Sequence, residues 1–221
     1  MPDLDGPRWG PASGGPAKQV VLLLHGYGAD GNDLIDLAPR WGQAVPDALF
    51  VAPNAPEPLP GSAFGRQWWD LSDRNQARME AGVRAVVPVL DAVIARECAA
   101  AGVPETNVML MGFSQGAMTA LFCGLRRAAA PAAILAFSGY LIAPAALTAE
   151  IRSCPPVLLV HGEVDEVVPV MGSRAAEAAL REAGVPVEAA YSPRLGHGID
   201  EVGLSLGALM LQRAVASLSG A

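Results

Sequence analysis

The chain has 221 residues, of which 52% are hydrophobic and 17% are charged, and this length suits one compact domain with a single large core. Its 15 lysines and arginines stand against 22 aspartates and glutamates, and the net charge of −7 argues against a nucleic-acid partner, because phosphate binding requires clustered positive charge. No run approaches the roughly 18 consecutive apolar residues of a membrane-spanning helix, and the start MPDLDGPRWG lacks the regions of a secretory signal, so we expect a cytoplasmic protein without an integral membrane segment.

The N-terminal part of the chain divides into an arm and a first strand. Residues 1–18 are rich in proline and glycine, which predicts a flexible arm rather than a structural element, followed by one domain over residues 19–221. Residues 20–24, VVLLL, are typical of a strand buried on both faces of a parallel sheet. The segment HGYG closes this strand, and a helix over about 32–41 is expected next.

A second short strand is predicted over residues 48–53, and a proline-rich loop follows it over residues 53–75. This loop is too long for a mere connector, which favours a place beside a functional site. Residues 80–100 carry apolar side chains at the spacing of an amphipathic helix. Pro88 inside this stretch predicts a kink or a later start of the helix.

Strands and helices alternate over the rest of the chain. We predict a strand and turn over 107–114 with a helix to 127, strands from Ala132, from Pro156 and over 186–191, and helices over 171–183 and 201–218. This alternation predicts an α/β fold with a mostly parallel central sheet and helices on both faces. Functional residues in such sheets gather at the carboxyl ends of the strands.

The cysteines and histidines show no metal-binding pattern. Cys98, Cys123 and Cys154 form no CxxC pair, and their odd number argues against a disulfide framework. We interpret all three as reduced packing residues. The three histidines lie far apart in the sequence, and we predict no metal site.

Ser114 lies in GFSQG, between a predicted strand and a predicted helix. This is the setting of a nucleophile elbow, in which a sharp turn strains the serine backbone and Gly112 and Gly116 avoid collisions with it and with neighbouring strands. The helix N-terminus also favours developing negative charge. The alternative is an ordinary glycine turn with a capping serine; the strand and helix on either side favour a nucleophile.

A serine nucleophile needs a histidine to take its proton and an acid to orient the imidazole. The order serine, acid, histidine leaves His161 and His197 as candidates for the base. His197 is favoured, because it lies in the glycine-flanked loop LGHGID and is free to approach the elbow. His161 is tied to the end of a strand, where a structural histidine that bonds its own turn is expected.

The acid is expected in the turn HGEVDEVVPV. Asp165 is favoured, because it stands just before the chain re-enters an apolar stretch, whereas Glu163 and Glu166 are expected to remain solvated. Asp200 is the other competitor, and we interpret it as a helix N-terminal residue.

The oxyanion of a tetrahedral intermediate needs N–H donors. The backbone N–H of Gln115 follows the nucleophile, and the N–H of Tyr27 in HGYG is the expected second donor. The alternative for HGYG is a mere tight turn.

The blocks LLLHGYGADGNDL, APNAPEP, GFSQGAM, VHGEVDEVVP and GHGID occur in this order over nearly the whole chain. Together they resemble the carboxylesterase and phospholipase family of α/β-hydrolases, which includes the acyl-protein thioesterases. The resemblance implies a nucleophile at Ser114, an acid at Asp165, a base at His197 and oxyanion donors at Tyr27 and Gln115. It also implies a cofactor-free hydrolase of carboxylic esters or thioesters that is often a homodimer. Family thioesterases usually carry leucine after HG, so Tyr27 changes the pocket wall and counts against acyl-protein substrates.

The segment between AFSG and PVLLV is too short for a large cap domain. The expected cover is the 53–75 loop, with Phe64, Trp68 and Trp69 lining an acyl groove. A shallow groove favours short- to medium-chain esters, so the leading hypothesis is a serine carboxylesterase acting on a small-molecule ester. The alternatives are an acyl-protein thioesterase or lysophospholipase on the same scaffold, and a catalytically silent binding module.

Overall fold

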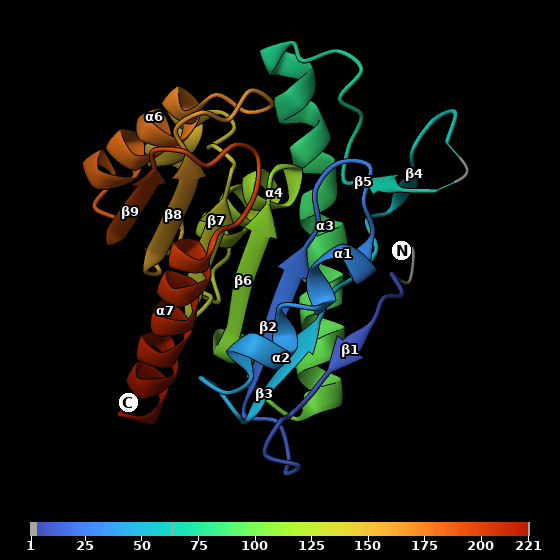
Figure 1. The fold of residues 1–221 in the computed structure, drawn as a ribbon, viewed down its shortest axis with the longest axis vertical. Coiled ribbons are helices and arrows are strands. Elements are labelled where there is room, and N and C mark those ends of the chain that lie inside the picture. Colours follow the sequence, from blue (N-terminus) through green and yellow to red (C-terminus); the bar gives the residue numbers. More distant parts are fainter. Residues whose placement is uncertain (1–3, 63, 221) are drawn as a thin grey trace.

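The computed structural model describes residues 4–62 and 64–220 of the chain (Figure 1). Its centre is a seven-stranded sheet of order β1-β3-β2-β6-β7-β8-β9. The strands are β1 Arg8–Trp9, β2 Gln19–Leu24, β3 Ala48–Val51, β6 Val108–Phe113, β7 Ala133–Phe137, β8 Val157–Gly162 and β9 Val187–Ser192. Only β1 runs antiparallel to its neighbour; the other six strands are parallel. The predicted mostly parallel α/β sheet is confirmed.

The central strands are buried on both faces, as their uninterrupted apolar runs predict. Alternate side chains of β2 point to opposite faces, so that Val20, Leu22 and Leu24 join one core cluster. Val21 and Leu23 join the other cluster. Two layers of helices therefore have to cover the sheet, one for each cluster.

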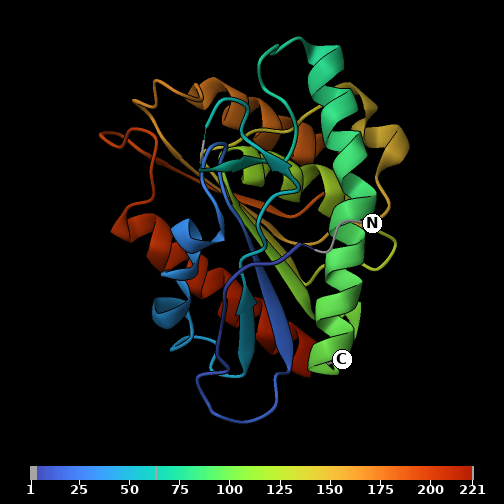
Figure 2. The same cartoon turned by 90° about the vertical axis from the view of Figure 1, so that its right-hand side faces the viewer.

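The helices form these two layers (Figure 2). One layer contains α3 Gln76–Ala101, α4 Gln115–Leu125 and α6 Val170–Glu182. The other contains α1 Gly31–Ile35, α2 Ala38–Trp41 and α7 Glu201–Ser219. Shorter elements complete the chain: β4 Glu57–Pro58, β5 Arg66–Gln67, α5 Leu147–Glu150 and the 3₁₀ turns η1 Glu105–Asn107 and η2 Pro144–Ala146. The connection between β7 and β8 holds only η2 and α5, in agreement with the expected absence of a large cap domain.

Two predicted helices differ in their bounds from the structure. The helix expected over 32–41 is split into α1 and α2, because Pro39 in the first turn of α2 lacks the N–H that would continue the α1 hydrogen-bond ladder. The long helix α3 starts at Gln76, earlier than predicted, since the Asn75 side chain accepts a hydrogen bond from the Ala77 N–H at 2.9 Å. It continues through Pro88 as one helix.

The predicted N-terminal arm contains a structural element. Strand β1 pairs with β3, Leu4 is buried, and the Trp9 and Phe50 rings are 5.9 Å apart. Arg8 forms an ion pair with the buried carboxylate of Glu97 at 2.6 Å. The prediction of a purely flexible segment is therefore wrong for this part of residues 1–18. The pairing covers the otherwise open edge of β3, and a two-residue strand is too short to leave a periodic pattern.

The helix α7 is long and apolar enough to cross a membrane by length and composition, with a mean hydropathy of 1.3 in its best window. The core helix of a globular domain passes the same test. Its residues Met210, Leu211 and Ala214 are buried in the core cluster against the sheet. Packing against the sheet therefore accounts for the apolar side chains on one face of α7, whereas Val202 and Leu209 of the same helix are exposed.

The three cysteines are free thiols. Cys98 and Cys123 are buried packing residues, as predicted, and burial raises the pKa of the Cys98 thiol to about 11 and that of the Cys123 thiol further. Cys154 is exposed, so the packing interpretation is wrong for this residue.

Candidate active site

Ser114 stands at the junction of β6 and α4, with backbone angles φ 55° and ψ −116°. A positive φ is strained for a residue with a side chain and is maintained only where the surrounding structure enforces it. Here the Ser114 N–H donates to the Phe137 carbonyl at 2.8 Å, which ties the turn to the neighbouring strand. The sharp strand-to-helix turn expected at this serine is confirmed.

The two glycines of the motif are required by close backbone contacts. A Cβ atom on Gly116 would lie 1.8 Å from the Leu24 carbonyl oxygen, and one on Gly112 would lie 2.2 Å from the Gly116 carbonyl carbon. Both distances are far below van der Waals contact. The steric reason given for G-x-S-x-G from the sequence is therefore confirmed.

His197 and Asp165 come from the loops after β9 and β8, and they meet directly. His197 Nδ1 lies 2.7 Å from Asp165 Oδ2, while Asp165 Oδ1 accepts the N–H groups of Val167 and Val168 at 2.9 Å each. Burial acts to raise the pKa of Asp165, but hydrogen bonds from Val168, His197 and Val167 outweigh it and lower this pKa. Asp165 is thus a buried, ionised acceptor for the Nδ1–H of His197.

His161 is fully buried beside the same carboxylate. Its Nε2 lies 2.8 Å from the Val168 carbonyl oxygen, which confirms the structural role expected from the sequence. The same nitrogen lies 3.2 Å from Asp165 Oδ2. This second contact leaves no signal in the sequence, because it depends on how the turn after β8 folds back.

None of the competing acids contacts His197 in the part of the chain that the structure describes. Glu163 pairs with Arg174 at 2.5 Å, and Glu166 is exposed. Asp200 caps α7 by accepting the Gly203 N–H at 2.8 Å, so its interpretation as a helix N-terminal residue is confirmed.

The predicted oxyanion donors belong to two turns at the same cavity, which Tyr27 and Gln115 both line. Gln115 is the first residue of α4, so its N–H has no acceptor within the helix. The turn that holds Tyr27 is fixed by the 53–75 loop: the Gly28 N–H donates to the Arg66 carbonyl at 2.9 Å, and the Arg66 N–H donates to the Ala29 carbonyl at 2.8 Å.

His25 also stabilises this turn. Its Nδ1 bonds the Gly26 carbonyl at 2.8 Å, and its Nε2 accepts the Ala55 N–H at 3.0 Å. Burial lowers the pKa of His25, so the ring is neutral and able to accept. The Trp68 indole N–H adds a hydrogen bond to the His25 carbonyl at 2.9 Å.

The Gln115 side chain has a role that was not predicted from the sequence. It is fully buried; its Oε1 accepts the Trp68 N–H at 3.0 Å, and its Nε2 donates to the Trp69 carbonyl at 2.7 Å. The residue beside the nucleophile therefore holds the long loop in place. The only sequence signal was a polar residue at the start of an otherwise apolar helix.

The acyl-groove prediction for the aromatic residues of the loop is wrong. Phe64 is 85% exposed, whereas Trp68 and Trp69 are only 1% and 2% exposed and pack in the core. None of the three lines the cavity at Ser114. A large apolar indole is stabilised more by burial against α3 and the sheet than by lining an open groove. The loop residues that do line the cavity are Leu71 and Arg74.

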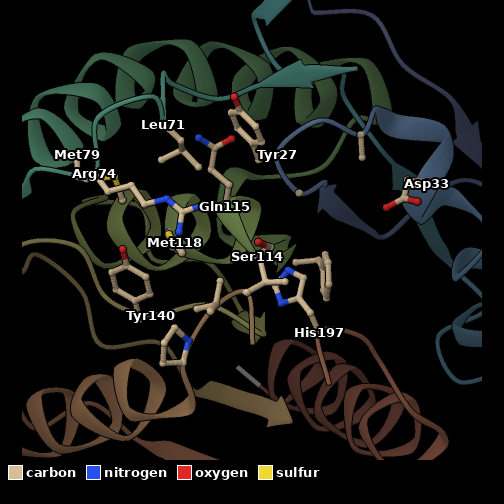
Figure 3. A pocket seen from close by; sticks show the side chains of 16 residues that line it. Tyr27, Asp33, Leu71, Arg74, Met79, Ser114, Gln115, Met118, Tyr140 and His197 are labelled. Carbon is tan, nitrogen blue, oxygen red and sulfur yellow. The ribbon is translucent and has the colours of Figure 1, made fainter. Parts of the chain in front are cut away.

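The cavity at Ser114 has a volume of about 290 Å³ (Figure 3). Ser114 and His197 lie at the same end of it, and apolar side chains form much of the wall. The wall includes Tyr27, Leu71, Met79, Phe113, Met118, Tyr140, Val167, Val168 and Pro169. The Phe113 and His197 ring centroids are 4.8 Å apart, so an apolar ring also supports the imidazole. Among the residues that the structure describes, no group of three or more His, Cys, Asp or Glu side chains is arranged to hold a metal ion.

The chain is similar to known esterases and thioesterases. The chain matches the family model described as phospholipase/carboxylesterase over residues 11–209. It is similar to the crystal structure of esterase PE8, with 46% identity, a TM-score of 0.90 and coverage of 96% of this chain and 99% of that one. Esterase YpfH of Escherichia coli (strain K12) is 30% identical over 84% of this chain and 78% of its own length. Acyl-protein thioesterase 1 of Neurospora crassa is 27% identical over 80% of this chain and 79% of its own.

Proposed function

The chain belongs to the phospholipase/carboxylesterase family and is a carboxylic-ester hydrolase, and we propose that it acts as a serine carboxylesterase with Ser114, His197 and Asp165 as its catalytic triad. The observation that carries this proposal is the 2.7 Å contact between His197 Nδ1 and Asp165 Oδ2. It fixes the imidazole at the cavity that contains the strained Ser114.

In the first half of the proposed reaction, Ser114 Oγ attacks the ester carbonyl carbon while His197 Nε2 takes the hydroxyl proton. The carboxylate of Asp165 stabilises the imidazolium and holds the Nδ1–H tautomer. The tetrahedral intermediate then collapses: the alkoxide leaves with the proton from Nε2, and an acyl group remains on Ser114. A water molecule then attacks the acyl carbonyl carbon while His197 takes its proton. The second tetrahedral intermediate collapses, Ser114 Oγ takes the proton back, and the carboxylic acid is released.

The negative charge of the tetrahedral intermediate falls on the former carbonyl oxygen. The N–H groups of Tyr27 and Gln115 are its proposed donors, because both residues line the cavity beside Ser114. The hydrogen bonds of β5 and His25 hold the Tyr27 turn before substrate arrives. Such preorganised donors need no rearrangement when the charge forms.

The substrate is proposed to be a short- to medium-chain ester. A cavity of about 290 Å³ lies just below the range of about 300 to 1,000 Å³ for small-molecule sites. An acyl-protein thioesterase activity is the second candidate, favoured by the relatives of that name. A catalytically silent binding module is disfavoured by the esterase relatives and by the paired His197 and Asp165. A cytoplasmic location and a homodimer remain part of the proposal.

The test is hydrolysis of p-nitrophenyl butyrate by the wild-type protein and by Ser114→Ala. A loss in kcat of about 10⁴-fold or more is expected for a disabled triad. Turnover that survives the substitution would rule out Ser114 as nucleophile. Matched oxyester and thioester substrates of equal acyl length separate the two candidate activities.

A further inference from the structure

The cavity at Ser114 contains a cation that ester hydrolysis by the proposed triad does not use. Arg74 lies at the end of the long loop, directly before the N-cap residue of α3. Figure 3 shows its guanidinium extending into the cavity toward Met118 and Gln115. Among the described residues that line this cavity, Arg74 carries the only permanent positive charge.

Arg74 is not neutralised by the protein. Its side chain makes no ion pair or hydrogen bond within the part of the chain that the structure describes. The neighbouring carboxylate of Asp73 pairs instead with Arg78, at 3.2 Å. In a chain with 22 acidic residues and a net charge of −7, an arginine that faces a cavity without a carboxylate partner keeps its five N–H donors available for a ligand.

The wall between Ser114 and Arg74 is apolar. Leu71, Met79 and Met118 line this part of the cavity, and Asp33 lies on the far side of Ser114 from Arg74 (Figure 3). Burial raises the pKa of the Tyr140 phenol, so Tyr140 stays neutral near pH 7 and does not supply a counter-charge. A molecule that spans the cavity would place an apolar segment on the methionines and its far end at the guanidinium.

A second cavity of about 300 Å³ adjoins the first, and Arg74, Met79 and Tyr140 line both. Its remaining wall is mainly apolar and includes Leu141 and Ile142. Arg74 therefore lies at the boundary of two cavities whose walls are mainly apolar.

We propose that Arg74 is a specificity-determining residue that binds a carboxylate on the substrate, remote from the ester that Ser114 attacks. The preferred substrates are then esters with an apolar segment and a terminal carboxylate. A guanidinium binds a carboxylate through two parallel charge-assisted hydrogen bonds, which matches the open fork of Arg74. This inference rests on the proposed function, because it assumes that the ester is cleaved at Ser114.

The test uses two matched pairs of substrates, one with the carboxylate on the acyl half of the ester and one with it on the alcohol half. For the acyl half, the mono-4-nitrophenyl ester of adipic acid is compared with 4-nitrophenyl hexanoate. For the alcohol half, the butyrate ester of 4-hydroxybenzoate is compared with that of its methyl ester. Each is assayed with the wild type, Arg74→Met, Arg74→Lys and the control Arg78→Met, which alters a neighbouring arginine that already pairs with Asp73.

Arg74→Met should lower kcat/KM for the carboxylate member of at least one pair by about ten-fold, the scale of one charge-assisted hydrogen bond at a solvent-open site. For the uncharged member of each pair, Arg74→Met should change kcat/KM by less than about three-fold. Arg78→Met should leave kcat/KM for both members unchanged. Arg74→Lys should retain part of the preference, since it keeps the charge but not the planar fork. Salt at about 0.5 M should weaken the preference of the wild type.

The substrate pair in which Arg74→Met lowers kcat/KM for the carboxylate member alone identifies the half of the ester that carries the carboxylate. Equal effects of Arg74→Met on both members of both pairs would overturn the role of Arg74, while hydrolysis of the uncharged esters by Ser114 would leave the proposed function standing. If the wild type cleaves none of the four esters, both proposals fail.

Discussion

The Nε2 atom of His161 lies 3.2 Å from Asp165 Oδ2, the same oxygen that accepts the hydrogen bond from His197. His161 at the end of β8 and His197 in the loop after β9 thus converge on one buried carboxylate. Only His197 reaches the cavity with Ser114, whereas His161 is fully buried. The local structure after β8 therefore assigns one histidine to the open site and the other to the support of the acid.

Replacing Asp165 with Asn should abolish most activity with little change in the fold. The amide can no longer hold His197 as the Nδ1–H tautomer, so Nε2 is not available as a base, and a loss in kcat of about 10⁴-fold is expected. The measurement is p-nitrophenyl butyrate turnover, with circular dichroism as the control for folding. Activity within about ten-fold of the wild type would show that another acid serves His197.

Acid should destabilise the wild type more than Asp165→Asn. The pKa of Asp165 is lowered in the folded protein, so its contribution to the free energy of unfolding is complete above the pKa of an unfolded aspartate, about 3.9. That contribution is lost as the pH falls through the lower folded value. Urea unfolding between about pH 6 and 3 should therefore show a steeper decline for the wild type. Parallel declines would mean that the carboxylate is not stabilised in the fold.

Replacing Gln115 with Met should weaken both stability and catalysis. The substitution keeps the volume but leaves the Trp68 N–H and the Trp69 carbonyl buried without the partners they have in the wild type. Each unsatisfied group costs about 1 to 3 kcal/mol, so for the two groups urea unfolding should show a loss of roughly 2 to 6 kcal/mol in the free energy of unfolding. A fall in kcat/KM should accompany it, because the loop that carries Leu71 and Arg74 loses its anchor. Unchanged stability would argue against this role.

Replacing Gly116 with Ala should be among the most damaging single changes. The added Cβ would lie 1.8 Å from the Leu24 carbonyl oxygen, so β2 and α4 would have to separate. We expect a loss of about 4 kcal/mol or more, the range reached by overpacking and backbone strain. Gly15→Ala is the matched control, because its nearest contact would be an exposed serine hydroxyl oxygen at 3.7 Å. Thermal unfolding of the two variants should differ widely; similar melting temperatures would contradict the close contact.

Much of the fold could be predicted from the sequence, because its signals are local. The runs VVLLL, NVMLMGF and PVLLV predict buried parallel strands, and their alternation with amphipathic segments predicts two layers of helices. The glycines around Ser114 predict the strained turn, because backbone strain depends on adjacent residues. The candidate acid and base could be chosen as well, since the ends of parallel strands meet at one edge of the sheet.

The tertiary structure decided what depends on contacts between distant segments. The sequence shows that Trp68 and Trp69 are large apolar residues, but it does not show what they pack against. Only the packing of the loop against α3 and the sheet places both side chains in the core instead of in the cavity at Ser114. The pairing of β1 with β3 likewise depends on an open strand edge far along the chain. The loop that ends at Arg74 is held by hydrogen bonds of Trp68 and Trp69 with Gln115, which lies 47 and 46 residues further along the chain, and Arg74 lines the cavity. The strands, the helices and the turn at Ser114 follow from local sequence. The residues that line the cavity are decided by how side chains from distant segments pack together.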